Sequence, residues 1–342
     1  MSTGSNGASR PNIDSLNPPA AIAGGDIELR GSAFTSESGV RPIVRFGEAE
    51  GRLVVGGGNR LVVRVPDEAH AQTLTVETSD GASEELACSI GLQIAEALHP
   101  VANPAVDRAG NIYTTRSGTR GEQVPVSIFK IDPSNTVRTF VQDIVNPTGL
   151  AMGPEGNLLV SSRNDGTIYS VDPSGEVETY AEGMGVATGI ALDNFHNLYV
   201  GDRTGTIFKI AIDRQIFVFA TLEPSISAYH LAWGPDGYLY VTGPTTSSHD
   251  VVQRVDENGN VEVFCEGFGR PQGLAFDEHG NLYVAASRQG RRGIFRIRPD
   301  RSVELVVSGP GIVGLAFLPS RDMAVVTTSD VYRVPTGSWL DE

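Results

Sequence analysis

The sequence predicts an all-β protein in which a small N-terminal β-sandwich is followed by a six-bladed β-propeller. The chain contains 40 glycines in 342 residues, as expected for many short strands joined by tight turns. A phrase of two apolar strands joined by a turn, which ends in Gly-Asn in three copies, recurs six times, with spacings of 46, 40, 41, 43 and 41 residues. A period near ~40–45 residues is typical of propeller blades. The copies begin at residues 103, 149, 189, 230, 273 and 314.

Each repeat continues into a third strand and a fourth strand. The third strands are expected at 127–133, 167–173, 206–212, 251–257, 293–299 and 330–336. Only five fourth strands follow, at 136–142, 176–182, 215–221, 260–266 and 302–308. The missing strand matches 91–98 in pattern. We therefore expect 91–98 to pair with 330–336 and close the ring, which removes two open sheet edges.

The N-terminal part has a different pattern. Residues 1–10 are rich in Ser, Gly and Asn and are predicted to be disordered. Residues 11–90 contain about seven short strands, which indicates a β-sandwich, and 91–342 form the predicted propeller. The stretch resembles an IPT/TIG immunoglobulin-like domain at Pro11, Ile13, Pro18, Gly24-Gly25, Ile27, Gly31, Phe34, Phe46-Gly47 and Val65-Pro66.

Charge and composition exclude some partners. The net charge is −15, which argues against nucleic acid and anionic membranes. No apolar run is long enough for a transmembrane helix. The first twelve residues lack the features of a signal peptide, so the compartment is cytoplasmic if Met1 is the natural start and extracytoplasmic if a leader was removed. The two cysteines, Cys88 and Cys265, have no metal-site spacing and are expected to be inert thiols.

The repeated phrase carries a family resemblance. Pro147–Ala151 and Pro271–Ala275 have the pattern Pro-x-Gly-Leu-Ala, and each is followed by an Asn-Leu segment. The pattern resembles the NHL repeat and the six-bladed propellers of the gluconolactonase and regucalcin type, over all of 91–336. Such propellers host many functions, so the resemblance implies the fold more strongly than an activity.

The resemblance also implies a position for a metal site. Lactonases of this type hold a divalent cation with Glu, Asn and Asp side chains placed just before the Gly of the phrase. Here these positions carry no carboxylate, whereas Ca²⁺ usually takes charged oxygen ligands. The residues are Ala102, Thr148, Thr188, Tyr229, Gln272 and Val313. We therefore expect no metal and no other cofactor, since the usual ligands of a cation such as Ca²⁺ are missing.

The fourth repeat departs from the others. Four repeats begin with Gly and the first begins with Asn103, but the fourth begins with His230, preceded by Tyr229. His titrates near neutral pH, so His230 and Tyr229 are the candidate catalytic pair. The alternative is that both side chains fill space and bond to neighbouring backbone. Residues at the start of the repeated phrase, or directly before its Gly, are further candidates for ligand binding. These are Asn103, Thr148, Thr188 and Gln272.

Arginines in the loops around the mouth of the central channel are a second group of candidate ligand-binding residues. We expect Arg163, Arg203 and Arg288 to contribute forked contacts to an anionic or sugar-acid ligand. The alternative is that these are ordinary solvated loop residues. The loop at 243–250, which contains His249, could reach over the channel mouth.

Two functions follow from these observations. The first is a propeller that binds a small polar or anionic molecule, or a partner, at its channel mouth, with the sandwich as a possible surface for a protein partner. The second is a lactone or ester hydrolase, or a lyase, with a site rebuilt around His230. The chain lacks the Gly-x-Ser-x-Gly elbow, the phosphate-binding glycine loop and the His-Glu-x-x-His motif, so the commonest hydrolase and nucleotide-enzyme routes are not favoured.

Overall fold

The structure is a computed structural model that describes residues 9–35, 39–116, 118–119, 121–247 and 249–340. Apart from Ser9 and Arg10, the tail predicted to be disordered lies outside the described residues. The chain divides into two compact units. The N-terminal unit runs to Leu92 and also includes 305–310 and the segment from Val334, and the propeller unit comprises 93–304 and 311–333. Within the described part no helix is long and apolar enough to cross a membrane.

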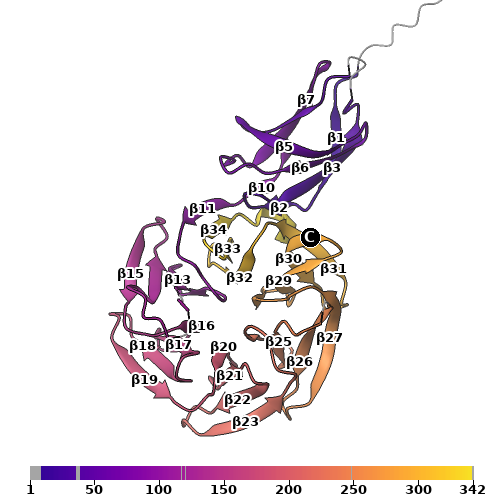
Figure 1. The fold of residues 1–342 in the computed structure, drawn as a ribbon. Coiled ribbons are helices and arrows are strands. Elements are labelled where there is room, and N and C mark those ends of the chain that lie inside the picture. Colours follow the sequence, from indigo (N-terminus) through magenta and orange to yellow (C-terminus); the bar gives the residue numbers. More distant parts are fainter. Residues whose placement is uncertain (1–8, 36–38, 117, 120, 248, 341–342) are drawn as a thin grey trace, which may run out of the picture. The chain divides into compact units, whose positions relative to one another are not determined.

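The N-terminal unit is built on one eight-stranded sheet (Figure 1). Its strands follow the order β1-β3-β6-β5-β4-β7-β8, with β9 also paired to β7. Their bounds are β1 (Asn12–Asn17), β3 (Asp26–Ser32), β4 (Ile43–Phe46), β5 (Ala49–Gly56), β6 (Arg60–Arg64), β7 (Thr73–Thr78), β8 (Gly81–Ala82) and β9 (Leu86–Ala87). A short 3-10 helix, η1 (Gly337–Leu340), belongs to the same unit.

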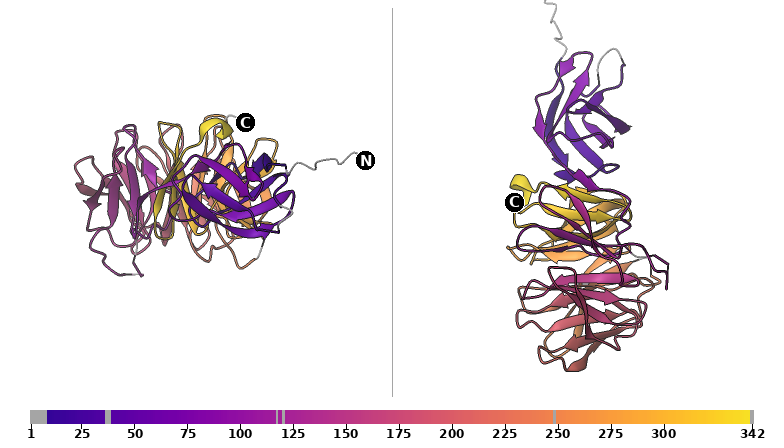
Figure 2. Two further views of the ribbon diagram at one scale, coloured as in Figure 1. Left: turned by 90° about the horizontal axis from the view of Figure 1, so that it is seen from above. Right: turned by 90° about the vertical axis from the view of Figure 1, so that its left-hand side faces the viewer.

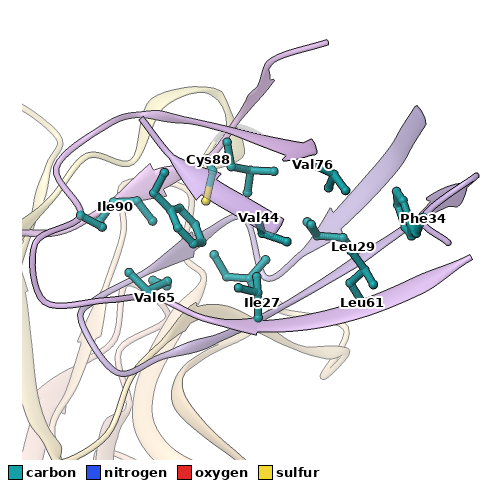
Figure 3. Packing of buried hydrophobic residues seen from close by; sticks show 14 residues of the cluster. Ile27, Leu29, Phe34, Val44, Leu61, Val65, Val76, Cys88 and Ile90 are labelled. Carbon is teal, nitrogen blue, oxygen red and sulfur yellow. The ribbon is translucent and has the colours of Figure 1, made fainter. Parts of the chain in front are cut away.

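Alternate residues of these strands form the core of the N-terminal unit (Figure 3). Ile27 and Leu29 are two positions apart on β3 and are fully buried, and Leu61 on β6 is buried beside them. Period-two burial is what a strand with one face on the core requires. Cys88 lies in this cluster as a free thiol, and burial raises its pKa to about 12. Cys88 is thus buried and held as the neutral thiol, whereas Cys265 is free and only half-buried.

Five sheets of four strands make up most of the propeller unit and are arranged around a common centre (Figure 1). Four of them use consecutive strands. The first has β12 (Ala105–Val106), β13 (Ile112–Thr115), β14 (Ile128–Ile131) and β15 (Val137–Val141). The second has β16 (Pro147–Met152), β17 (Leu158–Ser162), β18 (Ile168–Val171) and β19 (Val177–Ala181). The third has β20 (Ala187–Leu192), β21 (Leu198–Asp202), β22 (Thr206–Ile210) and β23 (Ile216–Thr221). The fourth has β24 (His230–Trp233), β25 (Leu239–Thr242), β26 (Asp250–Val255) and β27 (Val261–Phe268).

The fifth four-stranded sheet joins the two ends of the repeat region. Its order is β11-β34-β33-β32, so β11 supplies the strand that the last repeat lacks, as the sequence predicts. The bounds are β11 (Leu92–Ala95), β32 (Ile312–Phe317), β33 (Met323–Thr327) and β34 (Val331–Val334). The amide of Leu98 also donates to the carbonyl of Ser329 at 2.8 Å, which fastens the segment after β11.

The remaining repeat lies in a six-stranded sheet of order β10-β2-β31-β30-β29-β28. Four of its strands, β28 to β31, pair in chain order as they do in the other repeats. The bounds are β2 (Ala20–Ala21), β10 (Ser89–Ile90), β28 (Leu274–Phe276), β29 (Leu282–Arg288), β30 (Arg291–Ile297) and β31 (Val303–Ser308). Figure 2 shows the same strands from two further sides.

The recurring turn between first and second strands has a local cause. Asp107 accepts hydrogen bonds from the side-chain amide of Asn111 at 2.7 Å and from the hydroxyl of Tyr113 at 3.1 Å. The equivalent Asp193 and Asp277 accept the same pair of bonds from their own Asn and Tyr. The recurring Asp and Asn of this turn are therefore structural, because their side chains form hydrogen bonds within the turn, as Asp and Asn commonly do.

Candidate ligand site in the central channel

A cavity of about 200 Å³ lies where the innermost segments of all six repeats meet. It is lined by the segment leading into β12 and by residues of β16, β20, β24, β28 and β32. Each repeat contributes lining residues, among them Asn103, Gly149, Gly189, His230, Leu274 and Leu315. The other lining residues are Ala, Leu, Ile and Pro, so the side chains are mainly apolar, although polar atoms also make up a large part of the cavity surface.

The glycines of the phrase are required by close contact between neighbouring repeats. A Cβ on Gly189 would lie 2.8 Å from the Cα of His230 and would also meet the carbonyl oxygen of Tyr229. A Cβ on Gly314 would lie 2.7 Å from the carbonyl oxygen of Ala102. Real Cβ atoms do not approach backbone atoms this closely, because van der Waals repulsion rises steeply there. At this position of the phrase, a side chain is therefore found only where the repeat departs from Gly.

Asn103 is the first such departure, and its side chain is engaged by backbone. Its Nδ2 donates to the carbonyl of Leu274 at 2.7 Å, and its Oδ1 accepts the amide of Leu315 at 3.1 Å. One side chain thus joins the first repeat to the fifth and the sixth. The predicted ligand-binding residue lines the cavity, but its main hydrogen bonds are structural.

His230 is the second residue that replaces the Gly of the phrase, and it differs from Asn103 in its hydrogen bonding. Its side chain is 4% exposed and lines the cavity. Among the described residues its imidazole has no hydrogen-bond partner. Removal from water lowers the pKa of His230 to about 4, so the ring is neutral at pH 7. A neutral imidazole offers one donor and one acceptor. The ring nitrogens are not among the fully enclosed polar atoms that lack a partner, so water or a ligand in the cavity can bond to them.

Tyr229 points away from this cavity. Its side chain is 3% exposed and packs in a core cluster with Tyr199 and Leu231. Its hydroxyl donates to the backbone carbonyl of Glu223. Burial, followed by the charges of Glu223 and Asp202, raises the pKa of Tyr229 to about 12. The structure thus does not bring the Tyr229 hydroxyl to His230.

The other predicted ligand-binding residues also lie outside the cavity lining. The hydroxyl of Thr148 donates to the carbonyl of Asn146 at 3.3 Å. The hydroxyl of Thr188 donates to the carbonyl of Gly201 at 2.8 Å and accepts the amide of Tyr229 at 3.1 Å. The backbone amide of Gln272 donates to Ala285, and its half-buried side chain is not part of the lining.

These hydrogen bonds leave few oxygens to bind a divalent cation at the position used by lactonases of this type. The Thr148 and Thr188 oxygens are already bonded to backbone, and so is the Tyr229 hydroxyl. Ala102 and Val313 have no side-chain oxygen. In the described part of the chain no three His, Cys, Asp or Glu side chains come together as a metal site. The donor set does not fit Ca²⁺, which takes six to eight oxygens.

The three predicted arginines lie on different sheets and none lines the cavity. Arg163 follows β17 and its guanidinium donates to the carbonyl of Gly118 at 2.8 Å. Arg203 follows β21 and is exposed. Arg288 ends β29 and lines a separate hollow. The expectation of an anionic ligand in the channel therefore has no positive charge to support it among the described lining residues.

Sequence reasoning missed the residues that hold the inner strands together. The Ser161 hydroxyl accepts the Gly149 amide at 2.8 Å and donates to the carbonyl of Thr188 in the next repeat. Thr242 donates in the same way to the carbonyl of Gln272. The available signal was a hydroxyl residue at matching positions of the second strands. The apolar lining, including Leu150 and Ile190, was also missed, although it is the Leu or Ile of the repeated phrase.

Comparison with known proteins supports the architecture. No protein-family description matches the chain, and no curated protein sequence matches it. Among solved structures, an auxiliary nutrient binding protein from Bacteroides ovatus is 14% identical with a TM-score of 0.54, covering 96% of this chain and 99% of that one. A putative gluconolactonase is 16% identical with a TM-score of 0.60, covering 72% and 91%. A gluconolactonase from Xanthomonas campestris is 14% identical with a TM-score of 0.59, covering 72% and 90%. Likeness at this level of identity shows the fold, an all-β protein with a propeller-like arrangement of sheets.

Proposed function

We propose that this chain is a ligand-binding six-bladed propeller of the gluconolactonase and NHL type, preceded by an immunoglobulin-like sandwich, and that its site is the central channel. Six blades are supported by the cavity, which receives one inner segment from each of the six repeats. They are also supported by β28 to β31, which pair in the same order as the strands of the four-stranded sheets. The sandwich assignment rests on the alternating core of 11–90 and on the resemblance stated above.

The observation that carries the function is the buried imidazole of His230. It faces a cavity of about 200 Å³ without a protein partner among the described residues. A ligand that places a hydroxyl or a carbonyl oxygen against the ring would satisfy it, while the aliphatic lining would contact the rest of the molecule. The ligand is neutral, because no charged side chain among the described residues lines the cavity.

Binding is better supported than hydrolysis or elimination at this site. A general base works best when its pKa is near the working pH, and burial lowers the pKa of His230 to about 4. Among the described lining residues no carboxylate is present to orient the ring, and no hydroxyl or thiol is present as a nucleophile. The nutrient-binding and gluconolactonase structures share the fold and are compatible with either class.

A ligand screen with a matched variant tests the proposal. Small neutral alcohols, ketones and lactones would be titrated against the protein by ligand-observed NMR. The best binder should lose about tenfold in affinity in His230→Gln, as expected when one buried hydrogen bond is disturbed. His279→Gln is the control, because His279 is exposed on a turn. Equal affinity in wild type and His230→Gln would contradict the proposal, and turnover of a lactone that is lost in His230→Gln would favour the hydrolase instead.

Removal of divalent cations should have no effect on this protein. The oxygens near the lactonase-type positions are bonded to backbone, so no Ca²⁺ contributes to stability. We expect the melting temperature to be the same after dialysis against a chelator and after addition of CaCl₂. A rise in melting temperature that saturates with Ca²⁺ would show a site in conflict with this donor set.

A further inference from the structure

A second hollow, of about 280 Å³, lies outside the channel between the fourth and fifth repeats. It is formed by the end of β27, the hairpin between β29 and β30, and His249. We call it the arginine hollow because Arg288 and Arg292 both line it, together with Gly267, Phe268, Gly269, Ser287, Gln289 and Gly290. From this arrangement we infer that the arginine hollow binds a small organic anion through a carboxylate or phosphate group.

The first support is the local charge. The chain carries a net charge of −15, yet among the described residues no Asp or Glu lines the arginine hollow. Two acidic residues adjoin the lining. The side chain of Glu266 is exposed, and its backbone carbonyl accepts from Arg288. The buried carboxylate of Asp250, beside His249, accepts hydrogen bonds from Thr245 and from the Arg270 amide. Because two arginines and no carboxylate line the hollow, its local potential is positive, whereas the chain as a whole is negatively charged.

The second support is that the Arg288 guanidinium is held in place. Its Nη1 donates to the carbonyl of Glu266 at 2.5 Å, and its Cζ lies 5.1 Å from the ring centre of Phe268. Phe268 is buried and packs edge-on against Phe295, at 6.1 Å between ring centres. A guanidinium has five N–H donors, so donors remain for two oxygens of one anion. A fixed guanidinium loses less conformational entropy on binding than a free side chain.

The third support is the rigidity of the walls. Gln289 and Gly290 both have positive φ, 51° and 78°, which makes a two-residue hairpin turn of the tightest kind. Ser287 and Gly269 exchange backbone hydrogen bonds of 3.0 and 2.7 Å, and the Ser287 hydroxyl donates to the same Gly269 carbonyl at 3.0 Å. Ser287 lies opposite Arg292 in the register of β29 and β30. The backbone of Arg292 is therefore fixed by the same hairpin that carries Arg288, while its side chain is exposed.

Calorimetric titration with two simple probes tests the inference. Inorganic phosphate and malonate would each be titrated into the full chain at low ionic strength, where ion pairs are least screened. We expect saturable binding of at least one probe. Phosphate alone would indicate a phosphate ester as the natural ligand class, malonate alone a carboxylic acid, and both a site for either oxyanion. No saturable binding of either probe to the wild type would overturn the inference.

Charge-matched variants locate the binding. Arg288→Gln with Arg292→Gln should weaken binding by at least about tenfold, the cost of losing one charge-assisted hydrogen bond. Arg52→Gln with Arg203→Gln removes the same charge from exposed arginines elsewhere and should leave binding unchanged. Arg288→Lys keeps the charge but loses the fork and should bind malonate more weakly than the wild type. Circular dichroism would confirm that each variant is folded. Equal losses in the two double variants would overturn the inference.

His230→Gln separates this site from the channel. Because the arginine hollow and the channel cavity share no lining residue among those described, this variant should bind the anion probes as the wild type does. A failure of the channel proposal would therefore leave the arginine hollow untouched, and the reverse also holds.

Discussion

Gly189→Ala should destabilise the propeller unit by about 3 kcal/mol, the upper part of the usual range for inserting an atom into a packed interior. The new methyl group would meet the carbonyl oxygen of Tyr229 and would lie 2.8 Å from the Cα of His230. Both are backbone atoms of the next repeat, so they cannot move aside as a side-chain end could. The two inner strands would have to separate. Urea unfolding followed by circular dichroism would measure the loss.

Gly156→Ala is the matched control for that prediction. Gly156 has a positive φ of 83° and no atom within 4 Å of a built Cβ, so the substitution carries only a conformational cost of about 1 kcal/mol. Gly189→Ala should therefore cost clearly more than Gly156→Ala. If the two variants lose the same stability, the inner strands are not in the close contact described here.

Acid sensitivity between pH 6.5 and 4 should depend on His230. Burial lowers the pKa of this histidine from 6.5 in the unfolded chain to about 4 in the folded protein. The unfolded chain therefore binds a proton first as the pH falls, and each proton bound there favours unfolding. The resulting loss of unfolding free energy is negligible at pH 7 and grows below pH 6.5. It reaches about 3 kcal/mol near pH 4, since one pKa unit corresponds to about 1.4 kcal/mol.

Replacement of this histidine should remove that loss. In His230→Gln the slope of unfolding free energy against pH should flatten between pH 6.5 and 4, whatever the stability at pH 7. His279→Gln, which removes an exposed imidazole, serves as the control. Urea unfolding at a series of pH values would give both slopes. A His230→Gln variant as acid-sensitive as the wild type would show that this imidazole is not kept neutral by burial.

The repeat in the sequence was sufficient to predict the sheets and the strand that closes the ring. Its period sets the number of strands per unit, and the missing fourth strand could be assigned to 91–98 because a propeller leaves no other place for it. The structure confirms that β11 pairs with β34. The six-stranded sheet that contains β28 to β31 was not predicted, since β2 and β10 are only two residues long and have no periodic pattern of their own.

The site was predicted less well for a reason that lies in strand geometry. Tyr229 and His230 are neighbours in sequence, but successive side chains of a strand point to opposite sides. His230 lines the cavity, whereas Tyr229 packs in the core with its hydroxyl on the Glu223 carbonyl. Sequence could identify His230 by its departure from Gly. It could not show that the arginines belong to separate places, because loop residues have no periodicity that fixes their direction.

The hydrogen bonds of Asn103 have a consequence for the order in which the chain can acquire its structure. Its partners, Leu274 and Leu315, lie 171 and 212 residues further along the chain. A ribosome adds ~5–20 residues per second, so the first repeat emerges many seconds before the backbone groups that complete it. During that interval the Asn103 side chain has only water to bond with, and the inner edge of the first sheet has no neighbour on that side. Closure of such distant contacts is slow, because loop entropy is lost before the contacts form. The earliest repeat to be made is thus the last to be completed, which makes the newborn chain dependent on its C-terminal end.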